Sequence, residues 1–283
     1  MSAAAPAPRE LTFGFSPCPN DTFAFHALAH GLVGAPGVAI RPFLADVEEL
    51  NRRALGAELP LTKLSFHALA HVQDRYVLLR AGAALGRGCG PLVVARPQDT
   101  GLDLSAVTIA VPGRLTTAHL LLSLYLAKSP AVEPLIFSEI MPAVAAGKFR
   151  AGLIIHEGRF TYQEHGLVQL IDLGQWWEQT TGLPIPLGCI AARRDPGRET
   201  GLALERALAE SVRAAWAEPA ASRGYVRAHA QELEPAVLQG HIDLYVNRFT
   251  ADLGQEGLHA VAEALARGRA AGLLPASDLP LTW

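Results

Sequence analysis

Long apolar segments are missing from this sequence of 283 residues. No stretch approaches the ~20 apolar residues that a membrane-spanning helix needs. The longest candidate, residues 118–127, is interrupted by His119, Ser123 and Tyr125. In residues 1–10, no Lys or Arg precedes an unbroken apolar stretch, as it would in a secretory signal. We therefore expect a globular, water-soluble, cytoplasmic protein that does not act at a membrane.

An excess of either charge is also missing. The 24 Lys and Arg residues and 27 Asp and Glu residues give a net charge of −3, and no basic stripe interleaved with aromatic residues is present. These features argue against nucleic acid and anionic membranes as partners. A local basic site for a small anion remains compatible with this balance.

Cysteine is scarce, and the three residues Cys18, Cys89 and Cys189 lie far apart. Their number and spacing exclude a disulfide scaffold and a zinc motif of the usual kind. No phosphate-binding loop or dinucleotide fingerprint occurs, so no metal and no nucleotide cofactor is expected. Cys18 at a helix start could be a nucleophile, but the flanking Pro17 and Pro19 and the lack of an adjacent histidine favour a packing role.

Short β-prone segments alternate with helical ones along the chain. Apolar patterning predicts strands at residues 11–15, 38–43, 107–111 and 151–155, with helices between them. The last ~90 residues are mostly helical in pattern, and we expect them to pack back on the first part of the chain. Half of the residues are hydrophobic, which is enough for two lobes. The pattern predicts a two-lobed α/β protein.

Two similar segments, residues 90–96 and 187–193, bracket the middle of the chain. They could be paired strands along which the chain crosses to a second lobe and returns, forming a hinge. They could equally be two ordinary strands of a sheet. The first interpretation divides the chain into a disordered tail (1–10), a discontinuous lobe 1 (11–95 and 189–283) and lobe 2 (96–188). Each lobe could bury its own core, so a monomer is expected.

Polar residues follow four of the predicted strands, where ligands bind in α/β sheets. Three of these places are strand-to-helix turns, whose free N–H groups bind carboxylates and phosphates. Ser65, Thr116 and Thr117 could instead be helix N-caps, and the two roles are compatible. Lys63 would lie at the mouth of the sheet. The sequence therefore predicts a cleft between the lobes that takes a small anionic molecule.

His156 follows a run of apolar residues and precedes a Glu-Gly turn. Imidazole titrates near neutral pH, which suits a general base, although a structural histidine remains the alternative. Glu157 is not expected to orient His156, because neighbours on an extended strand point to opposite sides. The other histidines lie mostly on helical stretches and are interpreted as incidental.

Several segments resemble one family. Residues 15–23, Phe-Ser-Pro-Cys-Pro-Asn-Asp-Thr-Phe, are similar to the opening signature of the 1,4-dihydroxy-6-naphthoate synthases of the futalosine route to menaquinone. Residues 61–65, 111–117, 153–157 and 182–188 resemble the same family in the same order. The resemblance runs from about Leu11 to the C-terminus.

This resemblance implies a type II periplasmic-binding-protein fold, with a ligand cleft between lobes joined by two crossover strands. It implies a carbon–carbon lyase that needs no cofactor and converts cyclic dehypoxanthinylfutalosine to 1,4-dihydroxy-6-naphthoate and dihydroxyacetone. By motif, His156 would be the catalytic base. The substrate-binding residues would come from two turns, with three further residues in the cleft wall: Lys63, Leu64, Ser65, Thr116, Thr117, Ser16, Asn20 and Asp21. Lys63 or the threonine turn would hold the substrate carboxylate.

Two alternatives to this function remain at this point. A non-catalytic protein that binds small anionic solutes would share the fold but would need export. Chorismate dehydratase of the same pathway is the alternative enzyme.

Overall fold

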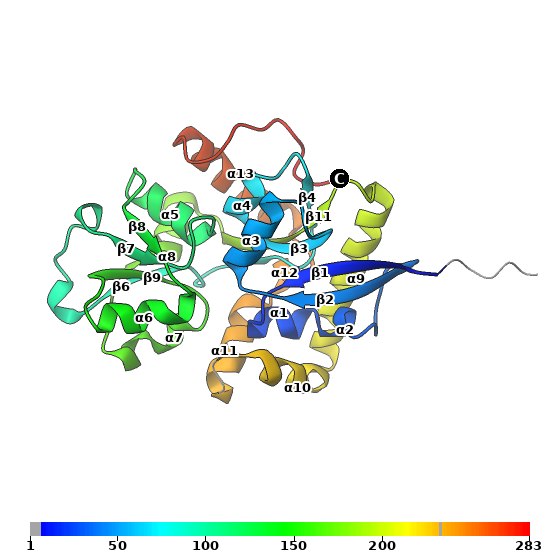
Figure 1. Cartoon of the computed structure of the whole chain (residues 1–283), viewed down its shortest axis with the longest axis horizontal. Coiled ribbons are helices and arrows are strands. Elements are labelled where there is room, and N and C mark those ends of the chain that lie inside the picture. The colour runs from blue at the N-terminus through cyan, green and yellow to red at the C-terminus, as the bar shows by residue number, and fades with distance from the viewer. Residues whose placement is uncertain (1–6, 232–233) are drawn as a thin grey trace, which may run out of the picture.

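The structure is a computed structural model that describes residues 7–231 and 234–283. It contains two β-sheets that lie side by side along the long axis of the molecule (Figure 1). The first has the strand order β2-β1-β3-β11-β4, with β5 also paired to β11, and the second has the order β10-β6-β9-β7-β8. The first sheet comprises β1 (Arg9–Phe15), β2 (Val38–Leu44), β3 (Leu61–Ser65), β4 (Tyr76–Leu78), β5 (Ala84–Gly86) and β11 (Ile185–Arg193). The second comprises β6 (Leu92–Ala95), β7 (Ile109–Val111), β8 (Val132–Pro134), β9 (Ala151–Ile154) and β10 (Val168–Asp172).

Helices cover both sheets (Figure 1). Those beside the first sheet are α1 (Pro19–Ala24), α2 (His26–Ala29), α3 (Val47–Leu55), α4 (Phe66–Ala70), α9 (Arg198–Ala217), α10 (Pro219–His229), α11 (Pro235–Tyr245), α12 (Arg248–Ala251) and α13 (Gly254–Ala270). Those beside the second are α5 (Thr117–Tyr125), α6 (Phe137–Ala145), α7 (Gly158–Thr161) and α8 (Leu173–Thr181). Within the described residues, no helix is both long and apolar enough to cross a membrane.

Local sequence signals explain where several helices begin. Asp46 starts α3 by accepting a hydrogen bond from the backbone N–H of Glu48 at 2.8 Å. Asp172 starts α8 in the same way, with the N–H of Gly174 at 2.9 Å. Aspartate satisfies N–H groups that would otherwise lack a partner at a helix start. Both aspartates are therefore followed directly by a helix.

The core of the larger half joins β1 to α9. Phe13 and Phe15 of β1 are fully buried and belong to the same apolar cluster as Leu204, Leu208 and Val212 of α9. These three leucine and valine positions fall on one face of the helix, as their spacing requires. The prediction that the C-terminal helices pack back on the first part of the chain is confirmed.

The chain crosses between the sheets differently from the prediction. Residues 92–95 form β6, which pairs with β9 and β10 of the second sheet and not with β11. The start of β11 pairs instead with β5, where Ile185 lies opposite Gly86. The predicted pairing of residues 90–96 with 187–193, and the placement of 92–95 in lobe 1, are therefore wrong. Strand β5 is too short to show an alternation in the sequence, whereas β6 is apolar throughout because it is buried on both sides.

The N-terminal boundary also differs from the prediction. Strand β1 begins at Arg9, which pairs with Val38, so residues 9 and 10 belong to the first sheet and not to a tail. Residues 1–6 of the predicted tail lie outside the described residues. The remaining lobe boundaries stay a prediction.

Candidate active site

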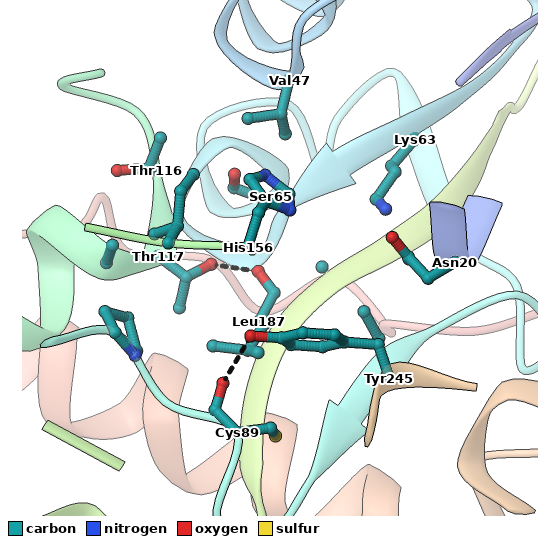
Figure 2. A pocket seen from close by; sticks show the side chains of 15 residues that line it. Asn20, Val47, Lys63, Ser65, Cys89, Thr116, Thr117, His156, Leu187 and Tyr245 are labelled. Atoms are coloured by element: carbon teal, nitrogen blue, oxygen red, sulfur yellow. Dashed lines mark hydrogen bonds between the residues drawn. The ribbon is translucent and has the colours of Figure 1, made fainter. Parts of the chain in front are cut away.

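A cleft lies between the two halves and is lined by residues of both. It encloses about 560 Å³ of empty space, which includes the open mouth. Six of the residues predicted for the site line it: Asn20, Lys63, Ser65, Thr116, Thr117 and His156. In the close view, Lys63 and Asn20 lie on one side, the two threonines on the other, and His156 between them (Figure 2).

The other three predicted residues do not line the cleft. The side chain of Leu64 is fully buried in an apolar cluster. Successive side chains of a strand point to opposite faces, so Lys63 and Ser65 reach the cleft and Leu64 does not. Ser16 and Asp21 lie behind Lys63, in contact with one another.

Lys63 and Asp21 form a buried ion pair. The Nζ atom of Lys63 lies 2.5 Å from Oδ1 of Asp21, and the two side chains are 4% and 2% exposed. The other carboxylate oxygen of Asp21 accepts hydrogen bonds from the backbone N–H and the hydroxyl of Ser16, at 3.0 and 2.6 Å. Asn20 donates its amide N–H to Oδ1 of Asp21 at 2.9 Å. The charge of Lys63 is thus balanced inside the protein.

The two threonines hold the start of α5. Thr116 is its N-cap, because its hydroxyl accepts from the N–H of His119 at 3.2 Å. The hydroxyl of Thr117 accepts from the N–H of Phe66 at 3.0 Å and donates to the carbonyl of Leu187 at 2.5 Å. The capping role considered for Thr116 is confirmed. Ser65 precedes α4 but makes no side-chain cap.

His156 follows β9 in an unusual backbone conformation. Its φ of 56° lies in the left-handed region, which non-glycine residues other than Asn, Asp and His seldom adopt. Burial, and secondarily the positive charge of Lys63, lowers the pKa of His156 from 6.5 to about 3. The ring is therefore neutral at neutral pH and offers a lone pair. Strained conformations of this kind concentrate at functional sites.

His241 lies next to the cleft residues Asn20 and His156, and the sequence analysis did not single it out. It is fully buried on α11, and its Nε2 atom lies 2.9 Å from Oδ1 of Asn20. Its ring is 6.0 Å from that of His156 between centroids, and its Nδ1 is 3.7 Å from Oε2 of Glu157. His156, Glu157 and His241 are the one group in the described chain whose ligand atoms, all within 4.8 Å of one another, could hold a metal ion. The sequence analysis interpreted His241 as incidental, whereas the structure places it against Asn20 and near His156.

Two residues of α3 were also missed. Asn51 donates to the hydroxyl of Ser65 at 3.1 Å and accepts from the N–H of the same residue at 2.9 Å. Glu48 accepts from Asn51 and from the N–H of Leu115 in the second half, both at 3.2 Å. Glu48 therefore connects the two halves beside the cleft. The i, i+3 spacing of Glu48 and Asn51 places them on one helix face, but nothing in the sequence indicates what that face contacts.

The cysteines behave as packing residues. Cys18, Cys89 and Cys189 are buried and form no disulfide within the described chain. Burial raises the pKa of Cys89 to about 12 and that of Cys18 further. A thiol with so high a pKa is a poor nucleophile at neutral pH. The burial of Cys18 agrees with the packing role predicted for it.

The fold belongs to a known class. The alkanesulfonate-binding protein SsuA of Xanthomonas axonopodis pv. citri superposes with a TM-score of 0.74, at 17% identity and over 99% of each chain. The chain therefore has the two-sheet α/β fold of periplasmic binding proteins, and the predicted fold class is confirmed.

Sequence comparison identifies the family within this class. A family model described as menaquinone biosynthesis matches residues 11–270, and the chain belongs to this family. A 1,4-dihydroxy-6-naphthoate synthase of Thermus thermophilus is 55% identical over 271 residues, which are 96% of this chain and 98% of the relative. A synthase of the same name from Streptomyces coelicolor is 52% identical over 272 residues, 94% and 95% of the two chains.

Proposed function

We propose that this chain is a 1,4-dihydroxy-6-naphthoate synthase of menaquinone biosynthesis. It is a lyase that converts cyclic dehypoxanthinylfutalosine to 1,4-dihydroxy-6-naphthoate and dihydroxyacetone. The proposed activity is supported by the similarity to two synthases, at 55% and 52% identity over nearly the whole chain. The proposed mechanism is supported by His156, whose neutral imidazole lies in the wall of the cleft.

The reaction breaks a carbon–carbon bond and forms an aromatic ring. Such a step needs a base for the proton, donors for the developing oxyanion and a site that excludes water. His156 is the base in this proposal, because its lone pair is available at neutral pH. The proton that it accepts returns to the dihydroxyacetone fragment, so the reaction consumes no oxidant or reductant.

An anionic substrate would improve His156 as a base. In the empty cleft, burial and the charge of Lys63 both disfavour the imidazolium form. A carboxylate close to the ring stabilises that form and raises the pKa of His156 toward neutrality. A general base works best when its pKa lies near the working pH. Substrate binding and activation of the base are therefore coupled in this proposal.

The threonine turn is the better of the two predicted holders of the substrate carboxylate. The positive charge of Lys63 is already balanced by Asp21 at 2.5 Å. Thr117 and Ala118 both line the cleft in the first turn of the nine-residue helix α5. Backbone N–H groups of a first turn have no partner within the helix and bind anions with the help of the helix dipole.

The proposal is tested by incubating the purified full chain with cyclic dehypoxanthinylfutalosine, without added cofactor, and following products by mass spectrometry. Dihydroxynaphthoate and dihydroxyacetone should appear in equal amounts. Chorismate, the substrate of the alternative dehydratase, is the matched control and should remain unchanged. Turnover of chorismate, or binding of the futalosine derivative without turnover, would refute the proposed activity.

A further inference from the structure

A chain of hydrogen bonds behind the cleft determines which nitrogen of His241 carries a proton. The carboxylate of Asp21, paired with Lys63, can only accept, so Asn20 turns its amide nitrogen toward it at 2.9 Å. The amide oxygen of Asn20 then faces Nε2 of His241 at 2.9 Å. An amide oxygen has no proton to donate, so Nε2 must donate. In the neutral ring, Nδ1 of His241 therefore presents a lone pair.

This lone pair faces another electron-rich atom. Nδ1 of His241 is buried, makes no hydrogen bond, and lies 3.7 Å from Oε2 of Glu157. Two acceptor atoms held at this distance in a buried place favour a positive species between them.

His156 completes a three-membered donor set with these two residues, whose ligand atoms all lie within 4.8 Å of one another. In a tetrahedral zinc site with bonds of about 2.1 Å, ligand atoms lie about 3.4 Å apart. The separation of 3.7 Å between His241 and Glu157 is already close to this value. His156 lines the cleft, so an ion has a path into the site.

We propose that His156, Glu157 and His241 bind a divalent transition-metal ion, best matched by zinc, and that the bound ion inhibits the enzyme. Two imidazoles and one carboxylate are ligands that zinc prefers, whereas magnesium and calcium prefer oxygen ligands. The hydrogen bond from Nε2 of His241 to Asn20 is of the kind that orients metal-binding histidines. The inhibitory role rests on the proposed function of His156 as the base.

Inhibition follows from where the three ligands come from. His156 and Glu157 follow β9 of the second sheet, whereas His241 belongs to α11 beside the first sheet. A bound ion therefore ties the two halves together across the cleft. It also occupies the lone pair with which His156 would remove the substrate proton.

The site is tested on the untagged full chain after treatment with a chelator. Titration with Co²⁺, followed by visible absorption, should show one ion per chain in a low-symmetry site, and calorimetry with Zn²⁺ should give the same stoichiometry. Zn²⁺ should abolish naphthoate formation over the range in which it binds, and chelator should restore it. Glu157→Gln should weaken binding by at least about tenfold, because even residues that only support the ligands change affinity by about 10–100-fold.

The matched control is His30→Asn. His30 lies on the surface with its ring 4.4 Å from that of His26, so this pair of imidazoles tests for ion binding outside the proposed site. The control should bind Co²⁺ as the unchanged chain does. His241→Asn is the second test variant, and thermal unfolding shows that each variant is folded.

Each result decides the proposal. Binding that is weakened by Glu157→Gln and unaffected by His30→Asn supports it. Absence of stoichiometric binding, or binding unchanged in folded Glu157→Gln and His241→Asn, overturns the site, and stimulation of turnover by Zn²⁺ overturns the inhibitory role. If the chain forms no naphthoate under any condition, the proposed function fails, while the Co²⁺ titration still decides whether the site exists.

Discussion

The two sides of the cleft differ in how their polar groups are used. On the first-sheet side, Lys63, Asp21 and Ser16 satisfy one another in a buried and electrically balanced cluster. On the second-sheet side, His156 is held in a left-handed conformation with a neutral ring, and α5 directs its N-terminus to the cleft. The first side is a wall of polar groups that satisfy one another, and the second carries the groups that remain available to a substrate.

The largest effect expected from this difference between the two sides is that of His156→Asn. Asparagine tolerates the left-handed backbone, so the fold should persist. Loss of a general base lowers turnover by about 10²–10⁴-fold, and we expect substrate binding to change much less. Product formation measured by mass spectrometry and substrate affinity measured by calorimetry check this prediction. A variant with full activity would remove His156 from the mechanism.

Substitutions on the first-sheet side of the cleft should lower the stability of the fold. Asp21→Asn leaves the ammonium of Lys63 buried without its counter-charge, and breaking a buried pair in this way costs about 3–5 kcal/mol. Urea unfolding measures the loss, and the double variant Asp21→Asn, Lys63→Met should recover much of it. Asp252→Asn breaks the exposed Arg80–Asp252 pair and should cost less than about 1 kcal/mol. Equal costs for the buried and the exposed pair would contradict the comparison.

Acid should weaken the protein through histidines on both sides. Burial lowers the pKa of His67 to about 4, with smaller effects of His71 and His119, and lowers that of His156 to about 3. Both side chains are neutral in the folded protein, whereas in the unfolded chain they bind protons below about pH 6.5. Stability is therefore full above pH 6.5 and decreases as the pH falls toward 4, by at most about 1.4 kcal/mol per pH unit for each group.

The variant His67→Asn separates the contribution of the first side. Urea unfolding at pH 7, 6 and 5 should show a shallower loss of stability in this variant than in the unchanged chain. Parallel curves for the two proteins would show that His67 binds its proton in the folded state as readily as in the unfolded chain.

The smallest effect is expected at the start of α5. Thr116→Val removes the hydroxyl that accepts from the N–H of His119, and loss of an N-cap costs about 1 kcal/mol. Thr116→Ser keeps the hydroxyl and should restore the stability. Thermal unfolding of the two variants makes the comparison. A loss that serine does not restore would assign the effect to the methyl group and not to the cap.

Residues that lie directly after a strand were the ones that sequence patterns could identify. The segments ending at Phe15 and Val111 are apolar, and the polar turns after them reach a common cleft because strand ends meet at one edge of a sheet. The capping aspartates Asp46 and Asp172 were readable for a similar reason, since a cap depends only on residues two or three positions away.

The partners of these residues could not be predicted, because they depend on how distant helices pack. His241 is 221 positions from Asn20 in the sequence, and its spacing on α11 resembles that of any buried helical residue. The pairing of Lys63 with Asp21 joins the turn after β1 to β3, and a lysine at a strand end gives no sign of such a partner. Strand β5 was missed because three residues are too few to establish a period.

The hydrogen bonds of the Thr117 hydroxyl determine which polar group of a ligand this side chain can bind. A hydroxyl carries a single proton, and that proton is committed to the carbonyl of Leu187, at the crossing between the sheets. One lone pair is committed to the N–H of Phe66 in the first half. The side chain of Thr117 can therefore offer a ligand one acceptor position. This position can accept a hydrogen bond from a hydroxyl group and repels a carboxylate oxygen. A substrate that bears both groups should therefore bind this side of the cleft in one orientation. Its hydroxyl group would contact the side-chain oxygen of Thr117, and its carboxylate would contact the backbone N–H groups of α5.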